Sequence, residues 1–431
     1  MSGMKRRLAG AMGGAILAAL LVGSPAAGLA QDLAVTGGTV HTVSGDVLEG
    51  ATVLIRDGRI AAVGHDVDVP AGTPILDATG RVLTPGLFDA TTSLGLVEVG
   101  MVSSTVDFRL QGDAVQAAFD VVDGINPRSI LIPVNRAAGL TTALSAPVGG
   151  LISGQAAIID LAGSSVDEMV AEPRAAMMAS FSAGAVGGAR GAVSLRLREV
   201  LDDARFWRDN RAAFDSGRAR EVAVSRLDLE ALGPVLDGEI PLIVNVHRAS
   251  DIEAVLRFAD EYELDLVISG GSEAWMVADR LAGAGVPVIV KPLANSPGGF
   301  DRLGARFDNA TVLDRAGVQV IIGSFNSHNA RWLILEAGNA VRYGLPWDVA
   351  LRAVTLAPAE ALGVSDRYGS LEPGKVGNLV VWTGDPFELS TRTESVVIRG
   401  VVASPDHRQL ELFRRYRNLD AEPPAFKETG F

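Results

Sequence analysis

The segment Pro85–Leu96 reads PGLFDATTSLGL and separates two differently organised parts of the chain. Its first residues have the pattern of a buried apolar strand, which ends in small polar residues and a glycine turn. Before this segment, short runs of β-forming residues alternate with tight turns, as in a small β domain. After it, strand and helix patterns alternate, which is typical of a parallel β/α barrel.

The composition excludes several kinds of site and partner. With 431 residues, the chain is long enough for one large α/β domain and a smaller one. A formal net charge of −13 argues against nucleic acid or an anionic membrane surface as a partner. There are no cysteines, so disulfides, thiol nucleophiles and thiolate metal sites are excluded. Only five histidines are present, at positions 41, 65, 247, 328 and 407, which restricts any imidazole cluster.

The first thirty residues have the pattern of a targeting segment. Three basic residues, Lys5, Arg6 and Arg7, precede an apolar run over 8–22, and small residues follow as far as Ala30. This order is typical of a secretory signal peptide. We expect cleavage after Ala30, a periplasmic or secreted protein, and no membrane association after cleavage.

We predict an α/β fold in which a TIM-like (β/α)8 barrel is flanked by a small β-sandwich built from both chain ends. The expected parts are a signal peptide (1–30), the N-terminal half of the sandwich (31–84), the barrel (85–365), the C-terminal half of the sandwich (366–405) and a polar tail (406–431). Asp57-Gly58 predicts a hairpin turn in the sandwich, because both residues tolerate positive φ angles.

Polar side chains follow several barrel strands at their C-terminal ends, where barrel enzymes place their chemistry. Asp160 closes one predicted strand, and Asn245 and His247 end another. Asp160 and His247 are the candidate catalytic residues. Glu273 either pairs with Lys291, binds a polar ligand, or begins the following helix, where a carboxylate is favourable. Lys291 is interpreted either as a Schiff-base lysine or as a solvated lysine at the rim.

Four further segments resemble the amidohydrolase superfamily, particularly exported imidazolonepropionase-like members. These segments are 57–64 at the start of the sandwich, Gly139–Thr142 in a barrel strand, Ala353–Gly363 in the last barrel helix and Gly369–Lys375 at the return to the sandwich. The resemblance implies a barrel of the metallo-dependent hydrolase type. It also implies hydrolysis of C–N bonds in amides, cyclic amides or peptides by water that one or two divalent metals activate.

The resemblance places the usual metal ligands on residues that cannot replace them. The two histidines of the first strand correspond to Thr91 and Ser93, and the histidine of the sixth strand corresponds to Gly270. The aspartate of the last strand corresponds to Phe325, whose phenyl ring offers no ligand or base. His247 is the retained histidine of the fifth strand. We therefore expect degenerate metal motifs and predict no cofactor, where zinc would be the family norm.

Two hypotheses remain open from the sequence. In the first, a non-catalytic pseudoenzyme binds a small molecule in the barrel mouth, and it forms a homo-oligomer or pairs with an intact paralogue. In the second, a working hydrolase keeps a reduced mononuclear metal site around His247 and Asp160. The predicted pocket residues are Thr91, Ser93, Asn245, Gly270, Glu273, Lys291, Phe325 and His328. For His328, a pocket position and a helix start are equally consistent with the pattern.

Overall fold

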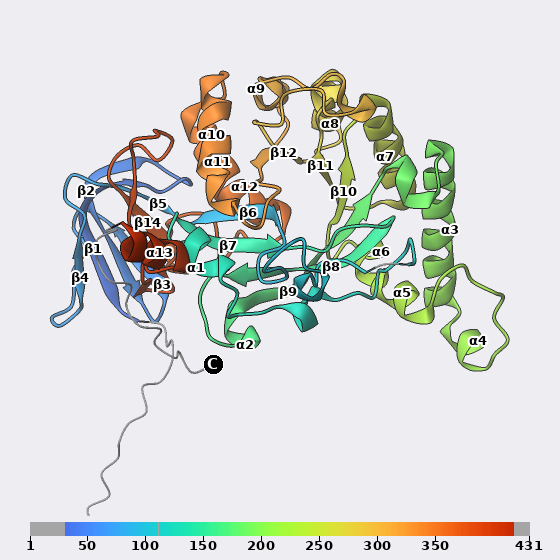
Figure 1. Cartoon of the computed structure of the whole chain (residues 1–431), viewed down its shortest axis with the longest axis horizontal. Helices are drawn as coiled ribbons and strands as arrows, with labels where there is room; N and C mark the ends of the chain where they lie inside the picture. Colours follow the sequence, from blue (N-terminus) through green and yellow to red (C-terminus); the bar gives the residue numbers. More distant parts are fainter. Residues whose placement is uncertain (1–30, 111, 418–431) are drawn as a thin grey trace, which may run out of the picture.

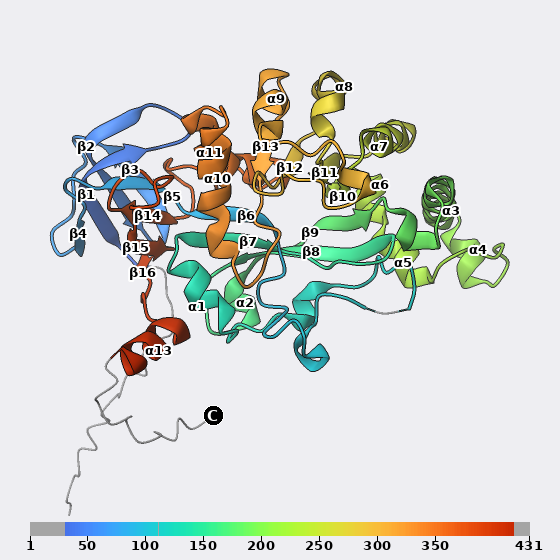
Figure 2. The ribbon, with the colours of Figure 1, turned by 45° about the horizontal axis from the view of Figure 1, so that its top comes forward.

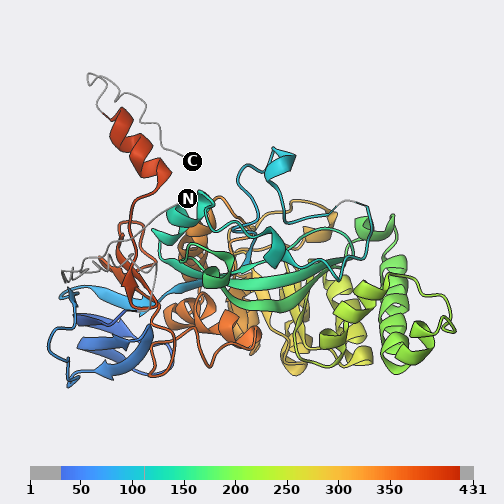
Figure 3. The same ribbon diagram turned by 90° about the horizontal axis from the view of Figure 1, so that it is seen from below.

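The computed structural model describes residues 31–110 and 112–417, which form two sheets and the helices around them (Figure 1). The predicted signal peptide, residues 1–30, lies outside the described residues. The sheet drawn mostly in blue lies at one end of the molecule, and helices α3 and α4 lie at the other (Figures 1 and 3). The barrel strands occupy the space between them.

The sheet at the blue end, which we call the second sheet, is built from both ends of the described chain. Its strands are β1 (Leu33–His41), β2 (Val47–Arg56), β3 (Arg59–Gly64), β4 (Ile75–Asp77), β5 (Val82–Pro85), β14 (Leu379–Trp382), β15 (Thr393–Ile398) and β16 (Val401–Val402). Along the sheet the order is β16-β15-β14-β5-β1-β2-β3, with β4 also paired to β1. The antiparallel pairing of β5 with β14 joins the two chain ends.

Local sequence explains this second sheet. Asp57 and Gly58 have φ angles of 48° and 72°, which confirms the predicted hairpin turn between β2 and β3. Alternate apolar residues of the strands, such as Val53, Ile55 and Leu379, are buried in one apolar core. The β unit predicted from both chain ends is therefore present as one hydrogen-bonded sheet.

The barrel sheet confirms the predicted TIM-like fold. Its strands, in spatial order, are β6 (Leu87–Thr92), β7 (Leu140–Ser145), β8 (Ile152–Asp160), β9 (Val170–Ser180), β10 (Leu242–Val246), β11 (Leu266–Gly270), β12 (Val288–Val290) and β13 (Val320–Ile322). We call the face where the parallel strands end the mouth, and the face where they begin the bottom. The strands carry continuous apolar runs because both faces of the sheet are covered.

Strand β8 is the exception to the parallel arrangement. It pairs antiparallel with β7, placing Asp160 beside Thr142, and antiparallel with β9. The connection between β7 and β8, residues 146–151, is much shorter than the crossover of a dozen or more residues that a parallel pair requires. The barrel is therefore mixed, and β8 ends at the bottom.

Helices cover the outside of the barrel strands, and those between β10 and the chain return lie together on one side (Figure 2). The α-helices of the barrel region are α1 (Leu131–Arg136), α2 (Val166–Met169), α3 (Arg190–Asp209), α4 (Arg211–Asp215), α5 (Arg226–Ala231), α6 (Gly233–Leu236), α7 (Ala249–Tyr262), α8 (Ala278–Gly283), α9 (Asn309–Arg315), α10 (Leu333–Arg342), α11 (Trp347–Ala353) and α12 (Leu356–Ala361). Short 3-10 helices are η1 (Ser103–Thr105), η2 (Val121–Gly124), η3 (Ala183–Val186), η4 (Ala274–Val277), η5 (Phe300–Arg302) and η6 (Ala330–Trp332). In the parts of the chain that the structure describes, no helix has the length and apolarity to cross a bilayer.

The predicted polar tail begins with a helix. Helix α13 (Arg408–Tyr416) has no buried residue and projects away from both sheets (Figure 3). His407 caps it, since its Nδ1 accepts a hydrogen bond from the Leu410 amide at 3.2 Å. The tail is polar as expected, but a capped, strongly amphipathic segment forms regular structure.

Candidate functional site

Two adjoining cavities open at the barrel mouth. The first cavity has a volume of about 300 Å³ and lies at the ends of β10, β11 and β12. The second cavity, of about 570 Å³, lies at the ends of β6 and β9 and beside the connection from β7 to β8. Asn245 and Phe325 line both cavities, so these two side chains mark the boundary between them.

His247 follows β10 and lines the first cavity with both ring nitrogens engaged. Its Nδ1 lies 3.0 Å from the Ser272 hydroxyl, and its Nε2 lies 2.8 Å from Nη2 of Arg302. Because Arg302 can only donate, Nε2 acts as the acceptor and Nδ1 carries the proton. Burial and the nearby Arg302 charge lower the pKa of His247 to about 4. The imidazole is therefore neutral at physiological pH, and its basic nitrogen already binds a cation.

Gly270 ends β11 directly beside this ring. A Cβ atom at Gly270 would lie 2.4 Å from Cε1 of His247, and the residue has a φ of 94° that favours glycine. No side chain fits at position 270 while the His247 ring stays in place. The imidazole thus occupies the space that a histidine at the end of the sixth strand would need.

Thr91 and Asp89 join the first and last strands of the barrel. Asp89 is fully buried, and its carboxylate accepts hydrogen bonds from the amides of Thr91 and Ser324 at 3.0 and 3.1 Å. The Ser324 hydroxyl also donates to Asp89, and the Phe325 amide donates to the Thr91 hydroxyl at 3.2 Å. A Cβ at Gly323 would lie 2.1 Å from the Thr91 hydroxyl, so glycine permits this approach. Thr91 therefore closes the barrel where the resemblance implies a metal ligand.

Ser93 and Phe325 complete the mouth without offering metal ligands. The Ser93 hydroxyl donates to the Ala146 carbonyl at 2.8 Å, and its amide donates to the Ser327 hydroxyl at 3.1 Å. Phe325 has a φ of 50°, a left-handed conformation that bulky residues seldom adopt. Such backbone persists where the surroundings fix it, and it is common at ligand sites.

Two predicted pocket residues line neither cavity. Glu273 is buried, and its carboxylate accepts from the amides of Ala249 at 3.0 Å and Gly304 at 2.9 Å. It therefore holds the start of α7 and the chain after η5 rather than pairing with Lys291. His328 has its Nε2 3.1 Å from the Glu98 carbonyl, away from both linings. Thr91, Ser93, Asn245, Gly270, Lys291 and Phe325 do line the cavities.

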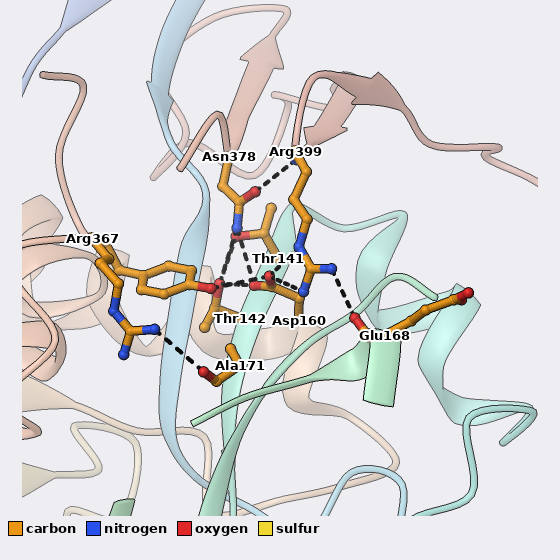
Figure 4. Close-up of polar contacts among 9 residues, drawn as sticks. Thr141, Thr142, Asp160, Glu168, Ala171, Arg367, Asn378 and Arg399 are labelled. Atoms are coloured by element: carbon orange, nitrogen blue, oxygen red, sulfur yellow. Dashed lines mark hydrogen bonds and ion pairs between the residues drawn. The ribbon is translucent and has the colours of Figure 1, made fainter. Parts of the chain in front are cut away.

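Asp160 does not lie beside His247 at the mouth, as the hypothesis of a reduced mononuclear metal site requires, because β8 runs antiparallel to β7 and β9. Asp160 lies at the bottom and is completely buried, and Figure 4 shows its polar contacts. One oxygen accepts from Nε and Nη2 of Arg399 at 2.8 and 2.6 Å and from the Tyr368 hydroxyl at 3.1 Å. The other accepts from Thr142 at 3.1 Å and from the Asn378 amide at 3.2 Å. This carboxylate ties the barrel to the second sheet.

Sequence reasoning missed a buried acid beneath the mouth. Glu336 of α10 is 3% exposed, and it accepts a hydrogen bond from the Leu293 amide at 2.7 Å. Burial, with a smaller contribution from Asp89, raises the pKa of Glu336 to about 7 despite the opposing charge of Lys291. Burial also raises the pKa of Asp89. No signal in the sequence separates Glu336 from an exposed helical glutamate.

The donor set at the mouth does not fit a divalent metal. Across residues 31–110 and 112–417, no group of three or more His, Cys, Asp or Glu side chains could hold a metal ion. Zinc sites use at least three such ligands, and a histidine ligand binds the metal through an unprotonated ring nitrogen. Here the nitrogen of His247 accepts from Arg302, whose positive charge would also repel a cation.

Comparison with known proteins supports one family. A sequence model described as "Amidohydrolase family" matches residues 278–403. Amidohydrolase tasK of Hapsidospora irregularis is 26% identical over 402 residues, which are 83% of this chain and 41% of that protein. The chain thus spans less than half the length of tasK. An imidazolonepropionase of Sphingopyxis alaskensis is 25% identical, and the match covers 83% of this chain and 93% of that enzyme.

Solved structures give the same result. An amidohydrolase from Thermotoga maritima MSB8 is 28% identical, with a TM-score of 0.79, covering 86% of this chain and 99% of that one. Molinate hydrolase, at 17% identity and a TM-score of 0.55, shares the fold. The family model, the imidazolonepropionase relatives and the Thermotoga maritima structure together support an amidohydrolase-superfamily, imidazolonepropionase-like protein, by family a hydrolase acting on carbon–nitrogen bonds.

Proposed function

We propose that this amidohydrolase-superfamily protein binds a small molecule at the barrel mouth and does not carry out metal-dependent hydrolysis. The observation that carries the proposal is the packing of His247. Its ring fills the space above Gly270, and its basic nitrogen accepts from Arg302. A metal ion would have to displace a guanidinium to reach the retained histidine, and would then find no second imidazole beside it.

The remaining metal positions support the same proposal. Thr91 and Asp89 close the barrel through Phe325 and Ser324, and the Ser93 hydroxyl donates to a backbone carbonyl. Asp160 lies at the bottom of the barrel, so it cannot complete a reduced site with His247. Metal-activated water needs a ligand set with an open coordination position, and these residues do not provide one.

The mouth nevertheless retains the features of a binding site. The two cavities, of about 300 and 570 Å³, are in or near the size range of small-molecule sites. Their walls combine apolar and aromatic side chains with a few polar groups, the usual composition of such sites. In this proposal the protein is exported, and it acts as a homo-oligomer or beside a catalytically intact paralogue.

Metal analysis of the purified protein tests the proposal. The protein should be prepared from the periplasm without chelator, assayed for bound metals, and tested for hydrolysis of dipeptides, N-acyl amino acids and cyclic amides. We expect far less than one metal ion per chain and no turnover. Near-stoichiometric zinc, lost together with a hydrolytic activity in His247→Ala but kept in His328→Ala, would overturn the proposal.

A further inference from the structure

We propose that the first cavity binds a small organic acid, with its carboxylate or phosphate group held between Lys291 and Arg302. This inference rests on the proposed binding function and names the chemical class of the ligand. The shared chemistry is an anionic head group on a compact apolar body.

The lining of the first cavity is strongly cationic, although the chain as a whole has a net charge of −13. Lys291, Arg302 and Arg306 line it, and the described residues of its lining include no aspartate or glutamate. His247 is neutral at physiological pH, so it neither adds charge nor cancels it. In an acidic protein, such a concentration of positive charge marks a site for an anion.

Lys291 follows β12 and is half-buried at the cavity wall. The chain has only four lysines, at positions 5, 291, 375 and 427. Lys375 pairs with Glu372 at 2.7 Å, whereas the Lys291 ammonium makes no ion pair or hydrogen bond with any residue that the structure describes. Its charge acts on buried Glu336, which holds its proton up to a pH near its raised pKa of about 7. Lys291 therefore keeps capacity for a further anionic partner.

Arg302 of η5 also has no carboxylate partner among the described residues. Among the described residues, its side chain hydrogen-bonds only to the neutral His247 ring, at 2.8 Å. The adjacent Asp301 pairs with Arg190 instead, and Glu273 is held by two backbone amides. A guanidinium presents five donors, so one contact leaves most of them available for an anion.

Arg306 provides an internal contrast. Its Nη2 donates to Asp308 at 2.6 Å, and its guanidinium lies over the Trp275 ring at 4.6 Å from the ring centroid. This arginine is already neutralised and fixed by stacking. The two cations without acidic partners, Lys291 and Arg302, are thus the groups that an incoming anion would contact.

The rest of the wall limits the body of the ligand. Val290, Pro292, Phe307 and Phe325 are apolar, and the volume of about 300 Å³ admits only a small molecule. Ser272 and Asn245 add polar groups to the wall. A compact acid with one aromatic or aliphatic side chain therefore matches both the charge and the walls.

Isothermal titration calorimetry with four probes tests the inference: 3-phenylpropionate, phenyl phosphate, 3-phenylpropionamide and inorganic phosphate. We expect at least one of the two phenyl anions to bind about tenfold or more tightly than the neutral amide, because charge-assisted hydrogen bonds are lost with the amide. The carboxylate and phosphate arms identify the preferred head group. Inorganic phosphate shows whether the head group binds without an apolar body.

Variants assign the binding to the two cations. Arg302→Gln and Lys291→Met should each weaken binding of the preferred anion about tenfold. Arg257→Gln, which changes an exposed arginine of α7 outside the cavity, should leave it unchanged. Circular dichroism and thermal melting verify that each variant is folded.

A second readout follows His247 by NMR. Besides Arg302, the charged groups acting on this ring are Asp301 and Glu273. An anion bound at Arg302 should raise the pKa of His247 above its ligand-free value of about 4, since it offsets the guanidinium charge. His247→Gln identifies the signal among the five histidines.

Three results would each overturn the inference. The amide could bind as tightly as the phenyl anions, or no probe could bind at millimolar concentration. The preferred anion could also keep its affinity in both cation variants. These results are distinct from a failure of the proposed function. A zinc-loaded, active hydrolase that selects anions would contradict the proposed function alone. A metal-free protein that binds the amide as well as the acids would contradict only the anion site.

Discussion

At the bottom of the barrel, Asp160 is fully buried and its carboxylate accepts five hydrogen bonds. At the mouth, Lys291 and Arg302 face a cavity, and no carboxylate within the described chain pairs with either of them. Both regions lie at strand ends and both contain charged side chains. They differ in whether those charges are satisfied by the protein itself.

This difference separates structural charges from candidate functional ones. A buried ion pair with every oxygen occupied has no capacity left for a ligand, and breaking it exposes an uncompensated charge. Charges that the fold leaves without a partner remain available for an external one. The position of a residue at the end of a strand is therefore a weaker guide to function than the state of its hydrogen-bonding groups.

The largest expected effect comes from breaking the bottom network. Asp160→Asn leaves Arg399 partly buried without its counter-charge, so we expect a loss of about 3–5 kcal/mol in unfolding free energy. Urea denaturation measures it. Asp406→Asn is the matched control, because it removes an exposed partner of Arg414 and should cost less than about 1 kcal/mol. Equal losses in the two variants would contradict the comparison.

Restoring a histidine at the mouth should also destabilise the fold. Gly270→His forces a side chain into the His247 ring and a non-glycine residue to a φ of 94°, with an expected cost of about 2–4 kcal/mol. The double variant His247→Ala, Gly270→His should recover the part of the lost unfolding free energy that comes from the clash with the ring. Gly283→His, where a Cβ meets no neighbour within 4 Å, should cost less than about 1 kcal/mol. Additive losses in the double variant would show that the ring is not the obstacle.

The raised pKa of Glu336 predicts that the unfolding free energy depends on pH. Its folded pKa of about 7 exceeds the ordinary value of 4.5, so the folded state binds the extra proton between these values. The stability of the wild type relative to Glu336→Gln should fall as pH rises through this window, by about 3 kcal/mol in total. Unfolding curves from about pH 4 to pH 8 measure this difference. Glu199→Gln, an exposed glutamate paired with Arg196, should show no such trend.

The smallest expected effect is that of a chelator. If the mouth holds no structural metal, dialysis against EDTA should shift the melting temperature by less than about 1 °C, because no bound ligand stabilises the folded state. Differential scanning fluorimetry suffices for this measurement. A drop of several degrees that zinc reverses would place a metal in the mouth after all.

Much of the fold could be predicted from the sequence, because apolar runs and turn residues mark most barrel strands and the strands of the second sheet. The direction of β8 was missed, although the six residues between Ser145 and Ile152 are too few for a crossover. That error placed Asp160 on the wrong face. His247 and Lys291, both singled out from the sequence at strand ends, lie in the wall of the first cavity. The position of the His247 ring over Gly270 depends on a rotamer, and the burial of Glu336 depends on tertiary packing, so local pattern reveals neither.

The pairing of β5 with β14 also determines when the molecule can finish folding. Thr84 pairs with Val380, and all eight barrel strands lie between these two residues in the sequence. Contacts between such distant residues form slowly, because the intervening chain must first be ordered. Until β14 arrives, β5 presents an unpaired edge next to the first barrel strand, and such edges promote aggregation. Folding is therefore completed only when β14 pairs with β5. A chain that ends before Leu379 would keep this edge exposed and would tend to aggregate.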